Sequence, residues 1–209
     1  MNNSIIVPLF AKPVYISEDE YPVDKNLLEF FCKEEMITEP NHGGNLTTNN
    51  SHLFEKKELE GLKRFCVKHL EYYAYEVLQI KKSNKFYITQ SWSNINPTGT
   101  GHHKHWHTNS LISGVFYIIG EPCPIIFENA NFGAFGRGNQ VEYEEYNVYN
   151  TQNWWIDNTQ GKLVLFPSLL DHFVPENESE AGRMSLSFNT WIEGKMGLEG
   201  DKTEVIFKP

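Results

Sequence analysis

A change in the spacing of apolar residues near position 85 is the feature that most restricts the fold of this chain. Before it, residues 55–80 (EKKELEGLKRFCVKHLEYYAYEVLQI) place apolar side chains three and four positions apart, which predicts an amphipathic helix. A shorter helix is predicted over residues 25–36, with Asp24 as its N-cap. The core-facing stripe of the longer helix is expected to comprise Leu59, Leu62, Cys66, Leu70, Tyr73 and Val77.

After residue 84 the apolar residues follow a period close to two, in short runs separated by turn residues. Runs of this kind predict antiparallel strands in a sandwich or barrel. We therefore expect one mainly β domain over residues 1–209, with a helical lead-in over about 1–84 and a barrel over about 85–209. The acidic and aromatic stretch 129–160 is expected to be an insertion with one or two strands. The predicted strands cover 85–95, 110–119, 123–128, 161–168, 183–192 and 203–208.

The charge of the chain limits the partners it can bind through electrostatics alone. It has 18 basic and 27 acidic residues and a formal net charge of -9. This balance argues against binding a nucleic acid or an anionic membrane through bulk charge. The first residues lack the basic and long apolar regions of a secretory signal, and no later segment is apolar for the length of a bilayer. We expect a cytoplasmic protein.

Four histidines lie close together in GHHKHWHTNS, residues 101–110. In a strand, side chains two positions apart share a face, so His103, His105 and His107 would point in one direction. His102 is expected to be solvated. A His-x-His pair before a strand can give two ligands to one metal, but histidine-rich loops often bind nothing, so the cluster needs a partner.

A partner lies in GKLVLFPSLLDHFVPENESEAGRMSLSFN, residues 161–189, where His172 follows an apolar strand. The polar loop after it has the composition of a hairpin connection with its midpoint near 177–178, which would place Arg183 opposite His172 on the neighbouring strand. Because arginine is usually exposed, an arginine at the start of a strand is ordinarily a surface residue. However, Ser185, Ser187 and Asn189 lie on its side of an alternating strand. A face with arginine and hydroxyl groups suits a ligand that carries a carboxylate.

These motifs resemble the iron(II)- and 2-oxoglutarate-dependent oxygenases, in particular a small phage and bacterial branch of that superfamily. HWHTNSLISGVFYI (105–118) resembles its first metal motif and LVLFPSLLDHFVPENESEAGRMSLSFN (163–189) its second, while LFAKPVYI (9–16) and NNSHLFEKKELEGLKRF (49–65) resemble its opening and its helical lead-in. The resemblance implies a double-stranded β-helix, a jelly-roll barrel with helices packed on one sheet. It also implies a dioxygenase that uses Fe(II), 2-oxoglutarate and O2 and releases succinate and CO2. Such an enzyme would hydroxylate an unactivated carbon of a substrate that the sequence does not identify, either a small molecule or a protein side chain.

The resemblance also implies roles for individual residues. Iron would be held by His105, His107 and His172, and Arg183 would bind the distal carboxylate of 2-oxoglutarate. Tyr117, in GVFYI, stands where related enzymes often place a hydroxyl near the same carboxylate, and Ser185 lies on the polar face beside Arg183.

One departure from the superfamily pattern keeps alternatives open. The usual first motif is His-x-Asp, but His107 takes the place of the carboxylate, and three histidines are also a zinc pattern. His103 and His105 are the alternative first pair. The protein could be a cupin-like three-histidine enzyme that does not use 2-oxoglutarate, or a metal-binding module without catalysis.

The pocket rim and a lid are harder to assign from the sequence. Gln90, Trp92, Asn94 and Asn109 lie on segments beside the first metal motif, and Tyr143, Tyr146 and Tyr149 could form a lid. Ordinary packing and surface positions explain these residues equally well, so they are not assigned to the site.

Overall fold

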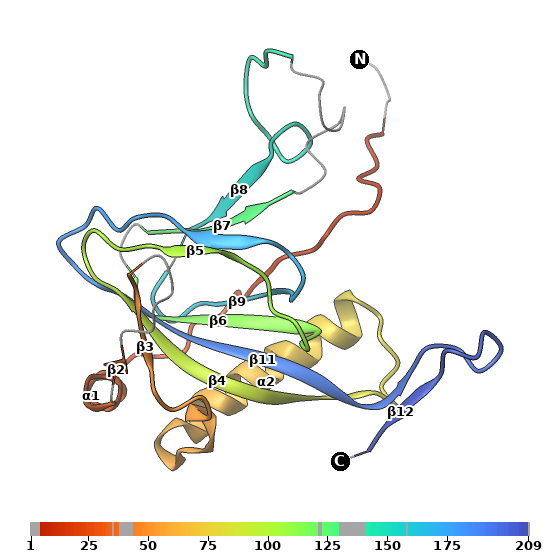
Figure 1. The fold of residues 1–209 in the computed structure, drawn as a ribbon, viewed down its shortest axis with the longest axis horizontal. Helices are drawn as coiled ribbons and strands as arrows, with labels where there is room; N and C mark the ends of the chain where they lie inside the picture. The colour runs from red at the N-terminus through yellow and green to blue at the C-terminus, as the bar shows by residue number, and fades with distance from the viewer. Residues whose placement is uncertain are drawn as a thin grey trace.

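Two antiparallel sheets form the body of the protein (Figure 1). The computed structural model describes residues 5–34, 36–37, 44–120, 123–129, 141–157 and 159–208. The small sheet has the strand order β5 (His102–His105), β10 (His172–Val174), β7 (Ile125–Glu128) and β8 (Asn153–Ile156). Within the described residues, the large sheet has the order β1 (Tyr15–Ile16), β9 (Leu163–Pro167), β6 (Ile112–Ile119), β11 (Arg183–Met196), β4 (Lys85–Asn96), β3 (Leu46–Thr48) and β2 (Met36–Ile37), and β12 (Val205–Phe207) pairs with β11.

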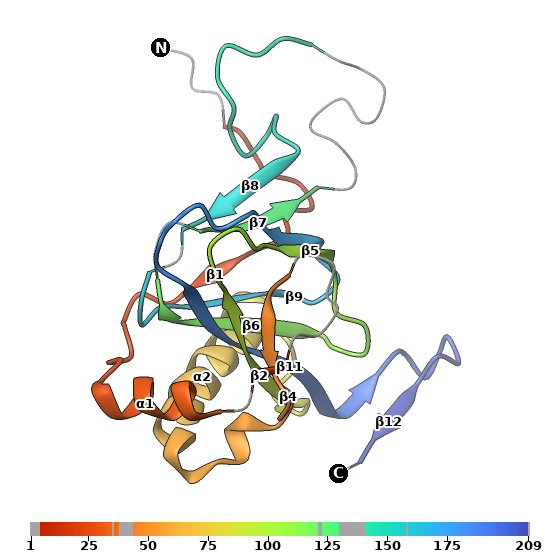
Figure 2. The same cartoon turned by 60° about the vertical axis from the view of Figure 1, so that its left-hand side comes forward.

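The chain passes back and forth between the two sheets. β4, β6, β9 and β11 belong to the large sheet, and β5, β7, β8 and β10, which come between them in sequence, belong to the small sheet. This alternation is that of a double-stranded β-helix, and the two sheets face each other in Figure 2. The predicted fold class is therefore confirmed.

Helices cover the outer face of the large sheet (Figure 1). α1 (Lys25–Lys33) begins as predicted, because the Asp24 carboxylate accepts a hydrogen bond of 2.8 Å from the Leu27 amide. α2 (Glu60–Tyr72) is preceded by the 3-10 turns η1 (Leu53–Glu55) and η2 (Lys57–Leu59) and continues into the π turn η3 (Tyr73–Val77).

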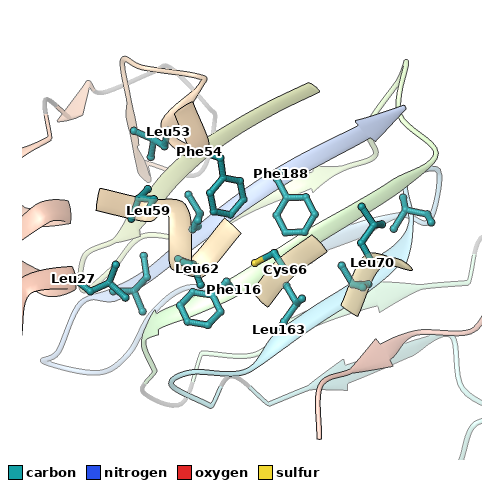
Figure 3. Packing of buried hydrophobic residues seen from close by; sticks show 14 of the residues in the cluster. Leu27, Leu53, Phe54, Leu59, Leu62, Cys66, Leu70, Phe116, Leu163 and Phe188 are labelled. Atoms are coloured by element: carbon teal, nitrogen blue, oxygen red, sulfur yellow. The ribbon is translucent and has the colours of Figure 1, made fainter. Parts of the chain in front are cut away.

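The main hydrophobic core lies between these helices and the large sheet (Figure 3). Its centre is fully buried, which is the arrangement expected of an amphipathic helix on a sheet face. Gly114 leaves room for the ring of Phe188 on the neighbouring strand. The α2 stripe is buried as predicted at Leu59, Leu62, Cys66, Leu70 and Tyr73, but Val77, at the end of η3, is 43% exposed.

A second, smaller core fills part of the space between the two sheets. It contains Tyr117 from the large sheet and Phe127 from the small sheet, among other residues. Alternate residues of β6 therefore face different cores: Phe116 and Ile118 point towards the helices, and Val115 and Tyr117 point between the sheets. The space left beside this inner core is where the polar face of the barrel lies.

The segment before residue 85 also contributes strands to the large sheet. β1, β2 and β3 all belong to the large sheet, because the chain pairs with β9 and β4 as it passes the sheet edges. In the predicted insertion, β8 is one strand and pairs with β7, while residues 130–140 and 158 lie outside the described residues. In the described part of the chain, no helix has the length and apolar character needed to cross a membrane.

Candidate metal centre and cosubstrate pocket

Three histidine side chains meet inside the barrel. His105 ends β5, His107 lies two residues after it, and His172 begins β10. One ring nitrogen from each lies within 4.8 Å of the other two, which is close enough for one metal ion to bind all three. The antiparallel pairing of β10 with β5 places His172 directly opposite His105. The predicted ligand trio is thus brought together.

Backbone carbonyls orient two of these imidazoles. The Nδ1 of His105 lies 2.7 Å from the oxygen of His103, and the Nδ1 of His172 lies 2.8 Å from the oxygen of Leu170. Since a carbonyl only accepts, each Nδ1 must be the protonated nitrogen that donates. The lone pair is then on Nε2, which is the tautomer that binds a metal through Nε2.

His102 lies in the site, although we expected it to be solvated. Its ring stacks on His105 with centroids 4.4 Å apart and planes at 20°. The cause is a β-bulge. His172 pairs with His105 and Val174 pairs with His102, so an advance of two residues along β10 corresponds to three residues along β5. The bulge breaks the period of two that predicted a common face for His103 and His105. Of the described residues, His102 and not His103 lines the cavity.

Burial keeps the clustered imidazoles neutral. It is the largest cause of a lowered pKa at each of them, and it acts with the neighbouring rings to lower the pKa of His102 to about 3 and that of His107 to about 4. Burial also lowers the pKa of His105, and it holds that of His172 well below its usual value. Neutral imidazole is the form that binds a metal, so these ligands are ready to bind at neutral pH.

Arg183 faces the same cavity from the other sheet. Its side chain is buried, at 3% exposure, and Nη1 donates to Asn96 Oδ1 at 3.1 Å and to Ser185 Oγ at 3.2 Å. Within the described part of the chain, the Nε atom has no hydrogen-bond partner. Among the described residues no carboxylate lies within ion-pair distance of Arg183, whereas the exposed Arg64 pairs with Glu60. A buried, always charged guanidinium without an acid is costly unless a ligand supplies one.

The predicted hairpin between His172 and Arg183 is wrong. β10 pairs with β5 and β7, while β11 pairs with β4 and β6, so the connection crosses from one sheet to the other. Asn177 directs this crossing, because its side-chain amide donates to the carbonyls of Asn96 and Ala181 at 2.9 Å each. His172 and Arg183 therefore lie on different sheets and line the cavity from opposite sides, instead of being neighbours on paired strands.

Tyr117 lies behind Arg183. The guanidinium carbon of Arg183 is 5.3 Å from the centroid of the Tyr117 ring. Among the described residues, the buried Tyr117 hydroxyl has no hydrogen-bond partner. Burial raises the pKa of Tyr117, and the charge of Arg183 opposes that rise in part. The hydroxyl is thus neutral and has a proton to donate.

The cavity between the sheets collects these groups in one place. It is a partly open cavity with a free volume of about 30 Å³. Of the rim candidates, Trp92 and Asn94 line it, whereas Gln90 and Asn109 are exposed and are not among its described lining residues. Its described lining is Trp92, Asn94, His102, His105, His107, Val115, Ile125, His172, Val174, Arg183, Ser185 and Ser187.

Another buried histidine, His69, and the three tyrosines considered for a lid lie outside this cavity. His69 is buried in α2, where its Nδ1 lies 2.7 Å from the Tyr15 hydroxyl, beside a cavity of about 650 Å³ between α2 and the N-terminal segment. Tyr146 and Tyr149 are exposed, at 71% and 49%, and Tyr143 packs against Tyr146. The described contacts of these tyrosines do not reach the histidines.

The donor set fits a divalent transition metal. Three neutral imidazoles suit Fe(II) and Zn(II) alike, and they leave coordination positions for other ligands. The wall opposite them carries the buried cation that a dicarboxylate would need at its far end. The fold and the site together define a metal-binding double-stranded β-helix.

Comparison with protein families identifies the class more closely. Residues 90–189 match the family described as "Putative 2OG-Fe(II) oxygenase". The match runs from within β4 to within β11 and includes the three histidines and Arg183. The match covers a little under half of the 209 residues and supports the assignment of the chain to the superfamily of 2OG-Fe(II) oxygenases that its motifs predicted. The protein is an oxidoreductase of the class that uses Fe(II), 2-oxoglutarate and O2.

Solved structures share the fold. A Pseudomonas putida prolyl-4-hydroxylase matches with a TM-score of 0.55 and 14% identity over 88% of this chain and 94% of that one. HygX from Streptomyces hygroscopicus, solved with nickel, 2-oxoglutarate and hygromycin B, matches at 0.55 and 8% over 86% and 82%. A viral collagen prolyl hydroxylase from Paramecium Bursaria Chlorella virus-1, in its 2OG complex, matches at 0.52 and 9% over 85% and 94%. Comparison with curated proteins finds no significant match.

The lowered histidine pKa values predict that the metal-free protein loses stability as the pH falls from about 7 to about 5. In the unfolded chain these imidazoles return to a pKa of about 6.5, so the unfolded state takes up protons that the folded state does not. The contribution of these neutral imidazoles to the free energy of unfolding is present above about pH 6.5 and is lost progressively as the pH falls below it. At about pH 5 the loss should be on the order of 2 kcal/mol for each of His102 and His107.

Urea unfolding in the presence of a chelator at several pH values measures this loss. His102→Gln should reduce the fall in the unfolding midpoint, whereas His52→Gln, at a half-exposed side chain, should not. A midpoint that does not change between about pH 7 and pH 5 would contradict the prediction.

Proposed function

We propose that this protein is a non-haem Fe(II)- and 2-oxoglutarate-dependent dioxygenase that hydroxylates an unactivated carbon of its primary substrate. His105, His107 and His172 hold the metal. Arg183, supported by Ser185 and Tyr117, binds the distal carboxylate of 2-oxoglutarate. We also propose that residues 1–209 act as one oxygenase domain, because α1 and α2 pack on the sheet that carries Arg183.

The observation that carries this proposal is the buried Arg183 facing three histidines across one cavity. A charge-assisted hydrogen bond to a carboxylate is worth about 1.5–3 kcal/mol, and burial excludes the water that would weaken it. A cupin-like three-histidine enzyme without a cosubstrate has no need of this cation. A structural metal site closes its coordination shell, whereas these histidines face a cavity.

The protein's own residues bind and orient in this proposal. The metal, when bound, supplies the redox chemistry that couples oxidation of 2-oxoglutarate to succinate and CO2 with hydroxylation of the substrate. His105 and His172 keep their Nε2 atoms directed inwards through Nδ1 hydrogen bonds to carbonyls. Because, among the described residues, no carboxylate joins the three imidazoles, the dianionic cosubstrate also balances the charge of the metal. Arg183 keeps its orientation through Asn96 and Ser185.

The primary substrate enters this proposal as either a small molecule or a protein side chain. The similar structures include an enzyme with bound hygromycin B and hydroxylases of prolyl residues and collagen, so the shared fold is compatible with both. Trp92, whose ring centroid is 5.8 Å from that of His107, is placed to contact a substrate beside the metal.

Uncoupled turnover tests the proposed reaction before any substrate is known. Purified protein with Fe(II), 2-oxoglutarate and O2 should release succinate slowly, and omission of any one of the three should stop it. His172→Ala should abolish the release. Succinate formation that persists in His172→Ala, or its complete absence in wild-type protein that binds both ligands, would contradict the proposal.

A further inference from the structure

A cluster of buried polar side chains lies outside the cavity and has no part in the proposed chemistry. The Ser168 hydroxyl is 2.7 Å from that of Ser110 and 2.8 Å from that of Ser113. Ser113 in turn donates to Asn189 Oδ1 at 2.8 Å. All four residues are nearly inaccessible, with exposures of 1%, 6%, 2% and 9% for Ser168, Ser110, Ser113 and Asn189. We refer to these four residues as the serine cluster.

The serine cluster joins the two segments that carry the histidines. Ser110 lies three residues after His107, and Ser168 lies four residues before His172. The backbones meet at the same point: the His107 amide donates to the Ser168 carbonyl at 2.9 Å, and the Ser168 amide donates to the Leu111 carbonyl at 3.1 Å. Ser168 therefore contacts the first metal motif through both its main chain and its side chain.

The cluster also fastens both segments to β11, the strand that begins with Arg183. The Thr190 amide donates to Ser110 Oγ at 3.2 Å, and the Thr190 hydroxyl donates to the Ile112 carbonyl at 2.7 Å. The bond from Ser113 to Asn189 is a further link, and the amides of Leu111 and Ile112 also donate to the Thr190 carbonyl and hydroxyl at 3.1 Å and 3.2 Å. The metal-binding segments and the strand of Arg183 thus share one buried anchor.

We propose that Ser168 is a positioning residue that sets the spacing of His107 and His172 through this cluster. The inference rests on the proposed metal centre, since these histidines are its ligands. Hydrogen bonds have defined lengths and directions, whereas apolar contacts tolerate sliding, so a satisfied polar cluster specifies one arrangement of the segments it joins. His105 and His172 are already paired across β5 and β10, but His107 lies beyond the end of β5 and depends on this anchor.

The effect of Ser168→Ala on metal binding tests this role. Removing the hydroxyl breaks two contacts and leaves the backbone bonds in place. Loss of a residue that orients a metal ligand typically weakens metal affinity by about 10–100-fold. Ser168→Ala should therefore weaken Co(II) binding in that range and alter the visible ligand-field spectrum of the Co(II) protein. Ser113→Ala, at the next position of the cluster, should change both in the same direction.

Ser91→Ala is the matched control. Ser91 is equally buried, at 1% exposure, and its hydroxyl accepts a hydrogen bond of 2.9 Å from the Phe54 amide on the helix side of the large sheet. This variant should lose stability to urea but keep the Co(II) affinity and spectrum of the wild type. The control therefore separates a general loss of stability from a change at the metal.

Two outcomes would overturn the inference, and they can be told apart. If Ser168→Ala and Ser113→Ala unfold at lower urea but bind Co(II) with wild-type affinity and spectrum, the cluster stabilises the barrel without positioning the ligands. If the wild-type protein binds Co(II) no better than His172→Ala does, the metal centre itself is wrong. Wild-type binding that is lost in His172→Ala and weakened in Ser168→Ala supports both proposals.

Discussion

Replacing His172 with alanine is expected to weaken Fe(II) binding by more than about 100-fold. Residues that only orient a ligand already change metal affinity by about 10–100-fold, and removal of the ligand itself should exceed that. His172 is 4% exposed, and its ring nitrogen lies within 4.8 Å of those of His105 and His107. Bulk water therefore does not readily take the place of its imidazole at the metal. His105→Ala and His107→Ala should have effects of similar size, measured by anaerobic calorimetric titration of Fe(II).

His103→Ala is the control for this prediction. His103 is adjacent to His102 on β5 but, among the described residues, does not line the cavity. Its replacement should leave Fe(II) affinity within a few-fold of the wild type. If His103→Ala is damaging and His107→Ala is harmless, the ligand pair is His103 and His105, and the register of the first motif is wrong.

Replacing Arg183 with methionine is expected to weaken 2-oxoglutarate binding by a factor between about ten and several hundred, with Fe(II) affinity nearly unchanged. The lost contact is a charge-assisted hydrogen bond worth about 1.5–3 kcal/mol, and an unpaired carboxylate in a dry cavity adds a further penalty. Arg183→Lys should recover only part of the affinity, because an ammonium keeps the charge but loses the planar fork. Isothermal titration of 2-oxoglutarate into the metal-loaded proteins measures the difference.

Arg64→Met provides the matched control. Arg64 has the same side chain on the surface of α2, with 71% exposure and a salt bridge to Glu60. Exposed ion pairs contribute little, so this variant should bind 2-oxoglutarate as the wild type does. Equal affinity in wild type, Arg183→Met and Arg64→Met would remove the cosubstrate role of Arg183 and favour the cupin-like alternative.

The strands were predictable from the sequence because each has a clear local pattern. The runs at 85–95, 110–119 and 183–192 correspond to β4, β6 and β11, and Asp24 caps α1 as its residue type suggested. The histidine trio could be predicted because its motifs resemble those of a known family. What could not be predicted was how the strands pair, since pairing depends on contacts that are distant in the sequence.

Two errors follow from this limit. The polar loop after His172 has the composition of a hairpin, but Asn177 donates a hydrogen bond to the carbonyl of Asn96, at the end of β4, and the chain changes sheets. The bulge between β5 and β10 brings His102 into the cavity, although strict alternation placed it elsewhere. The serine cluster could not be predicted for the same reason, since Ser113 and Ser168 are 55 positions apart in the chain.

Anaerobic titration of 2-oxoglutarate into the Fe(II)-loaded protein tests the central claim most directly. Chelation of the metal by the keto acid should produce a weak visible charge-transfer band that saturates with one-to-one stoichiometry. Arg183→Met should require a higher 2-oxoglutarate concentration to reach the same band. Wild-type protein that binds Fe(II) but develops no band at saturating 2-oxoglutarate would contradict the assignment of this site to 2-oxoglutarate chemistry.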